Sequence, residues 1–238
     1  IEEKIILEKK KKLHNLYHIF ISKAERDVVF EVQENSSPVQ AILSMIKEKE
    51  ADLVVMGQKG ESDLKEIIVG NTTKEIIEQA SCPVLIIPKD SDYSQINSIV
   101  YASDMEKEDI PALKQLIQLT SVFNPEIIVV HVFYKKDQDI ESLWVKHQQE
   151  IKETIDYPNL QFDSLYSENI AEELNRFLGS KEIDLLVMLE REKNQSLLSR
   201  LLHEDLVKQI GFGYSAPLIS FNKKYVVEPE KEILQETH

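Results

Sequence analysis

The feature that most constrains the fold of this chain is an internal repeat. The segment Asp52–Met56 (DLVVM) recurs as Asp184–Met188 (DLLVM), and Cys82–Ile86 (CPVLI) recurs in weaker form as Ala216–Ser220 (APLIS). Strand-like segments that return at nearly constant spacing indicate repeated structural units. We therefore predict two domains in tandem, over residues 1–90 and 96–224, followed by an acidic tail over 225–238.

The second copy alternates strand and helix patterns. Short apolar, mostly β-branched runs predict strands at Ser98–Ala102, Ile127–Phe133, Leu160–Leu165, Asp184–Leu189 and Pro217–Phe221. Helical spacing of apolar residues predicts helices at Ile110–Phe123, Ile140–Ile155, Ile170–Leu178 and Leu197–Ile210. Such alternation is typical of a parallel sheet covered on both faces. The predicted fold class is α/β, with two doubly wound, Rossmann-like domains in tandem.

The first copy is shorter than the second. It offers a helix at Ile1–Phe20, a strand at Val28–Gln33 and a helix at Pro38–Lys49 before the shared segments begin. Alignment with the second copy indicates that the first copy lacks its initial β-α-β unit. We expect the full precursor to carry about 35–40 further N-terminal residues, including a strand that ends in Asp.

The two final strands are expected to meet. Pro83–Ile87 and Pro217–Phe221 are apolar and end their copies, and an uncovered apolar edge strand invites aggregation. A two-fold relation would pair them antiparallel, and the short linker Lys89–Gln95 favours pairing within one chain. We predict an intrachain pseudo-dimer through these strands, which leaves a homodimer open.

The composition excludes several function classes. The net charge is −14, and the one basic cluster, Lys9–Lys12, is interpreted as a solvated helix face, so no nucleic-acid partner is expected. Cys82 is the only cysteine, which fits a reducing compartment, and no apolar run is long enough to span a membrane. We expect a cytoplasmic protein without a membrane partner.

Three of the six glycines lie in one window after the strand Asp52–Met56. Gly57 and Gly60 are followed after nine residues by Gly70-Asn71-Thr72-Thr73, which opens a predicted helix at Lys74–Ala80. Backbone amides and hydroxyls at a helix N-terminus favour an anion, and ligands of such sheets lie beyond the strands' carboxyl ends. On spacing alone, glycines that turn the chain and a capping Asn71 or Thr72 explain the window equally well.

This window resembles the ATP-binding signature of the universal stress protein family, and Ser81–Pro88 is similar to the last strand of that family. The resemblance implies an adenine nucleotide alpha hydrolase-like fold that binds ATP, with or without Mg²⁺, in the first domain. The nucleotide-binding residues it implies are Met56, Gly57, Gly60, Gly70, Asn71, Thr72 and Thr73. The family usually has Ser or Thr where Asn71 stands, and this weakens the expected binding.

The second copy departs further from that signature. It retains an Asp after its first strand, Asp104, but Leu189–Lys193 (LEREK) replaces the glycine loop, and two carboxylates there would repel phosphate. We predict no nucleotide in this copy and interpret Asp104 as a strand-end or capping residue. His131 is interpreted as a packed histidine within its strand.

Three functions follow, in order of preference. The first is a nucleotide-binding stress or regulatory protein that acts through nucleotide-dependent conformation or an unidentified protein partner. The second is a pseudo-dimeric scaffold whose nucleotide sites have decayed. An ATP-hydrolysing enzyme ranks last, because no general base or Mg²⁺-binding Asp lies beside the loop. No catalytic triad and no grouping with metal-ligand spacing occurs, so neither catalytic residues nor a metal site is predicted.

Overall fold

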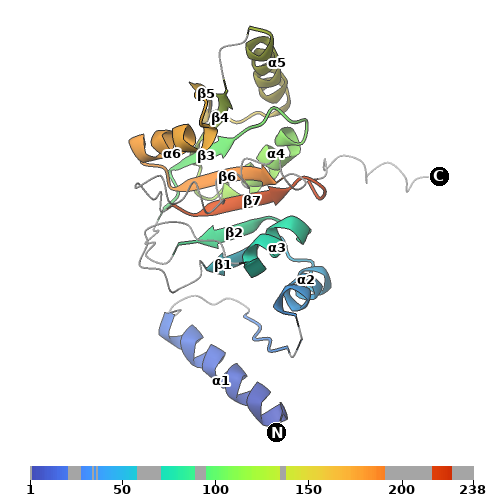
Figure 1. The fold of residues 1–238 in the computed structure, drawn as a ribbon. Coiled ribbons are helices and arrows are strands. Elements are labelled where there is room, and N and C mark those ends of the chain that lie inside the picture. Colours follow the sequence, from blue (N-terminus) through green and yellow to red (C-terminus); the bar gives the residue numbers. More distant parts are fainter. Residues whose placement is uncertain are drawn as a thin grey trace, which may run out of the picture.

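The computed structural model describes residues 2–20, 28–33, 35, 37–57, 71–88, 95–134, 138–190 and 216–226. Within these residues the chain forms one mixed sheet with helices on both faces (Figure 1). The strand order is β1-β2-β7-β6-β3-β4-β5. The strands are β1 (Val54–Gly57), β2 (Val84–Ile87), β3 (Ser98–Ala102), β4 (Glu126–Phe133), β5 (Leu160–Tyr166), β6 (Leu185–Glu190) and β7 (Leu218–Asn222). The α/β class predicted from the sequence is confirmed.

Two of the described helices begin at a capping side chain. The described helices are α1 (Glu2–Phe20), α2 (Pro38–Glu48), α3 (Asn71–Gln79), α4 (Asp109–Thr120), α5 (Gln138–Thr154) and α6 (Ile170–Ser180). Ser37 caps α2 by accepting a hydrogen bond from the Gln40 amide, and Pro38 occupies the first turn, where its missing N–H costs nothing. Asn169 caps α6 by accepting from the Glu172 amide at 3.2 Å.

Alternating strand residues build two cores, one on each face of the sheet. Val100 and Ala102 point to a core formed with α2, α3 and α6. Ile99 and Tyr101 point to a second core, to which α4 and α5 contribute Leu113, Leu116, Trp144 and Ile151. The period of two along each strand therefore decides which helices each side chain meets.

The two final strands join the halves of the chain. β2 and β7 pair antiparallel, with Val84 opposite Ser220 and Ile86 opposite Leu218. This pairing confirms the one predicted between the final strands within a single chain. The sheet is therefore continuous from β1 to β5, while the other described strand pairs are all parallel.

The prediction of a strand at Val28–Gln33 is wrong. Residues 28–33 have no regular secondary structure, because no described strand lies beside them to satisfy their backbone groups. Instead, the ring of Phe30 meets those of His14 and Tyr17 of α1 edge-on, at 5.5 and 5.6 Å between centroids. In Figure 1, α1 lies apart from the sheet.

Two boundaries also differ from prediction. α4 ends at Thr120 rather than Phe123, and Val122 is left 84% exposed in the turn that follows. α3 begins at Asn71, so Asn71, Thr72 and Thr73 form its first turn instead of preceding it. The helix predicted at Leu197–Ile210, residues 227–238 of the predicted tail and residues 89–94 of the predicted linker Lys89–Gln95 lie outside the described residues. No described helix combines the length and the apolarity that crossing a membrane requires.

Candidate functional site

The predicted nucleotide site begins at the carboxyl end of β1. Met56 is half-buried against the core, whereas Gly57 is exposed. A Cβ atom built on Gly57 would meet nothing within 4 Å, and φ at Gly57 is not positive. Neither packing nor backbone conformation in the described structure therefore requires a glycine at this position.

The site continues at the amino end of α3. Asn71 is exposed, Thr72 is half-buried and Thr73 is 7% exposed. Because β1 and β2 are parallel and α3 connects them, the amino end of α3 lies at the carboxyl end of β1. The structure thus brings Gly57 and Asn71–Thr73 to one end of the sheet. Gly60 and Gly70 lie outside the described residues.

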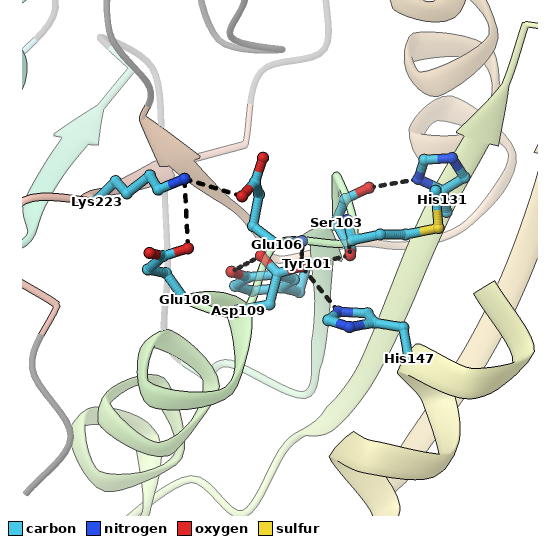
Figure 2. A network of polar contacts seen from close by, with 9 residues as sticks. Tyr101, Ser103, Glu106, Glu108, Asp109, His131, His147 and Lys223 are labelled. Atoms are coloured by element: carbon cyan, nitrogen blue, oxygen red, sulfur yellow. Dashed lines mark hydrogen bonds and ion pairs between the residues drawn. The ribbon is translucent and has the colours of Figure 1, made fainter. Parts of the chain in front are cut away.

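The corresponding place in the second half is filled by protein side chains. β4 lies on one side of β3 and β6 lies on the other, so the direction in which strands are added to the sheet changes between β3 and β6. Ligands of open α/β sheets bind beyond the carboxyl ends of the strands at such a position. Lys223, directly after β7, makes ion pairs there with Glu106 at 2.9 Å and Glu108 at 3.4 Å (Figure 2). The hydrogen bond with Glu106 raises the pKa of Lys223, so the lysine stays charged. Glu190, at the end of β6, is 9% exposed.

A buried carboxylate organises the polar core beside this point. Asp109, the first residue of α4, is fully buried. Its Oδ1 accepts a hydrogen bond from the Tyr101 hydroxyl at 2.8 Å. Its Oδ2 accepts from Ser103 Oγ at 2.6 Å, from the Glu106 amide at 3.1 Å and from His147 Nε2 at 3.1 Å (Figure 2). Four donors thus compensate the lost hydration of one buried charge.

Two histidines border this cluster. His131 in β4 is 9% exposed, and its Nδ1 donates to the Ser103 carbonyl at 2.8 Å. Its ring lies 5.5 Å from the Trp144 ring and 4.6 Å from the Phe133 ring. His147 lies one turn after Trp144 on α5, and its Nε2 is 3.1 Å from Asp109 Oδ2. The interpretation of His131 as a packed histidine is consistent with these contacts.

Ser103, His147 and Asp109 do not form a relay for nucleophilic attack. Ser103 and His147 both donate to the same Asp109 oxygen, whereas a serine nucleophile needs a direct hydrogen bond to its histidine base. Burial, with Asp109 adding to it, raises the pKa of Tyr101 well above its ordinary value, so this hydroxyl remains a donor. The cluster therefore has the geometry of a structural hydrogen-bond network and not that of a catalytic triad.

Sequence reasoning missed this cluster. It interpreted Asp104, which is half-buried, as a strand-end or capping residue and did not consider Asp109, which accepts a hydrogen bond from the Glu106 amide just before α4. The available signal was polar residues at helix positions facing the core: Asp109 precedes Leu113 by four residues, and His147 follows Trp144 by three. Cys82 is buried, and desolvation raises its pKa, which disfavours the reactive thiolate.

The described residues contain no group of three or more His, Cys, Asp or Glu side chains placed to hold a metal ion. This finding applies only to the described residues, which do not include 58–70.

Comparison with known proteins shows the fold, and over part of the chain a similarity to one family. A universal stress protein structure from Archaeoglobus fulgidus superposes on 90% of this chain, with a TM-score of 0.60, 16% identity and coverage of 76% of that chain. A structure from Pseudomonas aeruginosa matches 91% of the chain and 79% of its own length, with a TM-score of 0.63 and 14% identity. At these identities the likeness establishes the fold alone.

Residues 2–88 match the model of the universal stress protein family. A universal stress protein of Bacillus subtilis is 38% identical over 65 residues, which are 27% of this chain and 44% of that protein. One of Methanocaldococcus jannaschii is 29% identical over 92 residues, which are 37% of this chain and 54% of that protein. The matches thus span about half, or less, of these relatives. Over this segment the chain is similar to the universal stress protein family, as the resemblance implied.

Proposed function

We propose that this chain is a regulatory member of the universal stress protein family that binds an adenine nucleotide, with ATP as the expected ligand, at the carboxyl end of β1. The proposed binding residues are Met56, Gly57, Gly60, Gly70, Asn71, Thr72 and Thr73. The observation that carries the proposal is Gly57, which lies at the ligand-binding end of the sheet where nothing in the described packing requires a glycine. A glycine without such a reason is suited to the close approach of a ligand to the backbone.

The amino end of α3 supplies the complementary chemistry. Free amides in the first turn of a helix favour phosphate, and Asn71 is exposed there to hydrogen-bond it. Thr73 is largely covered, so we assign the closer phosphate contacts to Asn71 and Thr72 and to the backbone of this turn. Binding would present a nucleotide-dependent surface to a protein partner.

We propose that the second half binds no nucleotide. Lys223 and its two glutamate partners occupy the end of the sheet where a ligand would lie, and Glu190 adds a further carboxylate. A triphosphate entering there would have to break these ion pairs and face like charges at close range. One nucleotide per chain is therefore the expected stoichiometry.

The test is calorimetric titration of the chain with ATP. Gly57→Glu should abolish binding while the fold is retained, because a Cβ at residue 57 meets no atom within 4 Å and the added carboxylate would repel phosphate. Gly60→Glu should have the same effect. Gly179→Glu is the matched control, since Gly179 is an exposed glycine of α6 whose added Cβ also meets nothing.

Unchanged ATP affinity in both loop variants would show that the loop is not the site. If the unaltered chain takes up no ATP at all, the scaffold function, in which the chain acts only through protein contacts, is the better description.

A further inference from the structure

The two ends of α3 contact different halves of the chain. Its first turn, Asn71–Thr73, belongs to the proposed nucleotide site of the first half. Its last turn meets Asn222, the final residue of β7 in the second half. The Asn222 Nδ2 donates to the carbonyls of Ile77 and Glu78, at 3.3 and 2.8 Å. Because α3 has 9 residues, or about two and a half turns, its two ends share the same few backbone hydrogen bonds.

The second half fixes the side chain of Asn222 in place. Asn222 is buried and lies opposite Glu190 in the ladder between β6 and β7. Its Oδ1 accepts from the Lys224 amide at 3.0 Å, and its backbone carbonyl accepts from the Tyr225 amide at 2.9 Å. Only one orientation of the side-chain amide satisfies these partners, with Oδ1 toward the turn and Nδ2 toward α3. Asn222 is therefore a fixed donor that the second half presents to a helix of the first.

The repeat does not supply the reverse contact. Val84 and Leu218 are equivalent in the strand pairings β1–β2 and β6–β7. Four residues further along each copy, Pro88 takes the place of Asn222. A proline side chain has no hydrogen-bond donor, so it cannot cap a helix of the second half in this way. The cap therefore runs in one direction, toward the helix that begins at the proposed nucleotide site.

Phosphate at one end of α3 and the cap at the other favour the same state of this helix. Phosphate is attracted by the free amides and the positive dipole end of the first turn, and Asn222 satisfies carbonyls at the negative end. Each contact forms only while the helix is intact and in place, so each raises the population of the state that the other requires. By linkage, the nucleotide must strengthen the cap by the factor by which the cap strengthens nucleotide binding.

We propose that Asn222 is a positioning residue for the nucleotide site, through which the second half of the chain holds α3 in the position that binds phosphate. The inference rests on the proposed function, because it concerns the same site. It gives the half for which we propose no nucleotide a role in binding, since the end of its β7 anchors the helix that carries the phosphate contacts.

The experiment compares ATP affinities by calorimetric titration of the full chain. Asn222→Asp keeps the shape and the Oδ1 acceptor of the side chain but sets a carboxylate against two carbonyls at the negative end of α3. We expect ATP affinity to fall by about tenfold. Ile219→Val is the matched control, because Ile219 pairs with Leu85 across the β2–β7 contact and packs on the face of the sheet opposite α3. It should lower stability and leave ATP affinity unchanged.

A second measurement uses the unaltered chain. Saturating ATP should slow hydrogen exchange of the Asn222 side-chain amide severalfold, because the nucleotide strengthens the cap. NMR follows this exchange, and the absence of the signal in Asn222→Ser identifies it. Gly57→Glu, which should not bind ATP, is the control, and its exchange should not respond to ATP. This measurement decides the matter if Asn222→Asp does not fold.

Weaker ATP binding in Asn222→Asp but not in Ile219→Val, with slower exchange under ATP, is the expected result. Equal ATP affinities of these two variants, or an exchange rate that ATP leaves unchanged, would overturn the role of Asn222 while the proposed function stands. If no ATP binds, or if Gly57→Glu binds it as tightly as the unaltered chain, the proposed site is wrong and the role of Asn222 fails with it.

Discussion

Asp109 is the residue on which the interior of the second half depends most. A charge buried without partners is very costly, and Asp109 is accommodated because hydroxyl, amide and imidazole donors surround both of its oxygens. These donors come from the end of β3, the turn after it and α5. The carboxylate therefore fixes the packing of three elements at one point.

We expect Asp109→Ala to lower the free energy of unfolding by about 3–5 kcal/mol, because Tyr101, Ser103 and His147 would each lose a buried acceptor. Urea unfolding followed by circular dichroism measures this loss. Asp156→Ala serves as the control, since Asp156 is exposed and should change stability by less than about 0.5 kcal/mol. Similar midpoints for the two variants would contradict the importance of the cluster.

Tyr101 gives the protein a predictable response to alkaline pH. Its folded-state pKa is raised well above that of an unfolded tyrosine, chiefly by burial. Its contribution is therefore complete below about pH 10 and is lost as pH rises further, because only the unfolded chain then releases the proton. We expect Tyr101→Phe to reduce the slope of unfolding free energy against pH above about pH 10. An unchanged slope would show that Tyr101 is not protected from ionisation.

At the scale of elements, the antiparallel pairing of β2 with β7 joins the two halves of the molecule, and we call it the joint. β7 is buried throughout and β2 at alternate residues, and the side chain of Asn222 at the end of β7 adds contacts beyond the strand pairing. Its Nδ2 donates to the carbonyls of Ile77 and Glu78 at the end of α3, at 3.3 and 2.8 Å. Those carbonyls have no partner within a helix that ends there, so a side chain of one half caps a helix of the other.

Ile86→Lys should open this joint. Ile86 is 1% exposed and pairs with Leu218, and a lysine there would bury a charge in an apolar core. We expect a loss of at least about 3 kcal/mol in unfolding free energy, visible as a lower melting temperature. Val55→Lys, on the neighbouring β1 but 59% exposed, is the control and should melt like the unaltered chain. Equal melting temperatures would mean that the joint contributes little.

The elements that could be predicted from the sequence are those with a clear local sequence pattern. The strands from β3 to β7 and their helices follow from short apolar runs and helical spacing, and the β2–β7 pairing follows from the repeat. Val28–Gln33 has the composition of a strand but lacks a neighbouring one, and composition alone cannot reveal that. The Asp109 cluster escaped prediction because His147 lies 38 residues away in sequence and only packing brings the two together.

At the scale of the whole molecule, the two halves share one sheet but are covered unequally. In the second half α4 and α5 cover the face to which Val187 points, and Val187 is fully buried. In the first half the equivalent Val55 is largely exposed, although α2 and α3 cover the other face. The same position of the repeat is therefore surface in the described first half and core in the second.

The antiparallel joint also gives the molecule two chemically different poles. Because β7 runs opposite to β2, the carboxyl ends of β1 and β2 emerge at one end of the sheet, and those of β3 to β7 emerge at the other. The glycine pole and the pole sealed by Lys223 thus face away from each other. If the proposed nucleotide site is correct, a protein that senses the nucleotide at the first pole would leave the second untouched, so one chain would have room to tether two partners at once and to make only one of these attachments conditional.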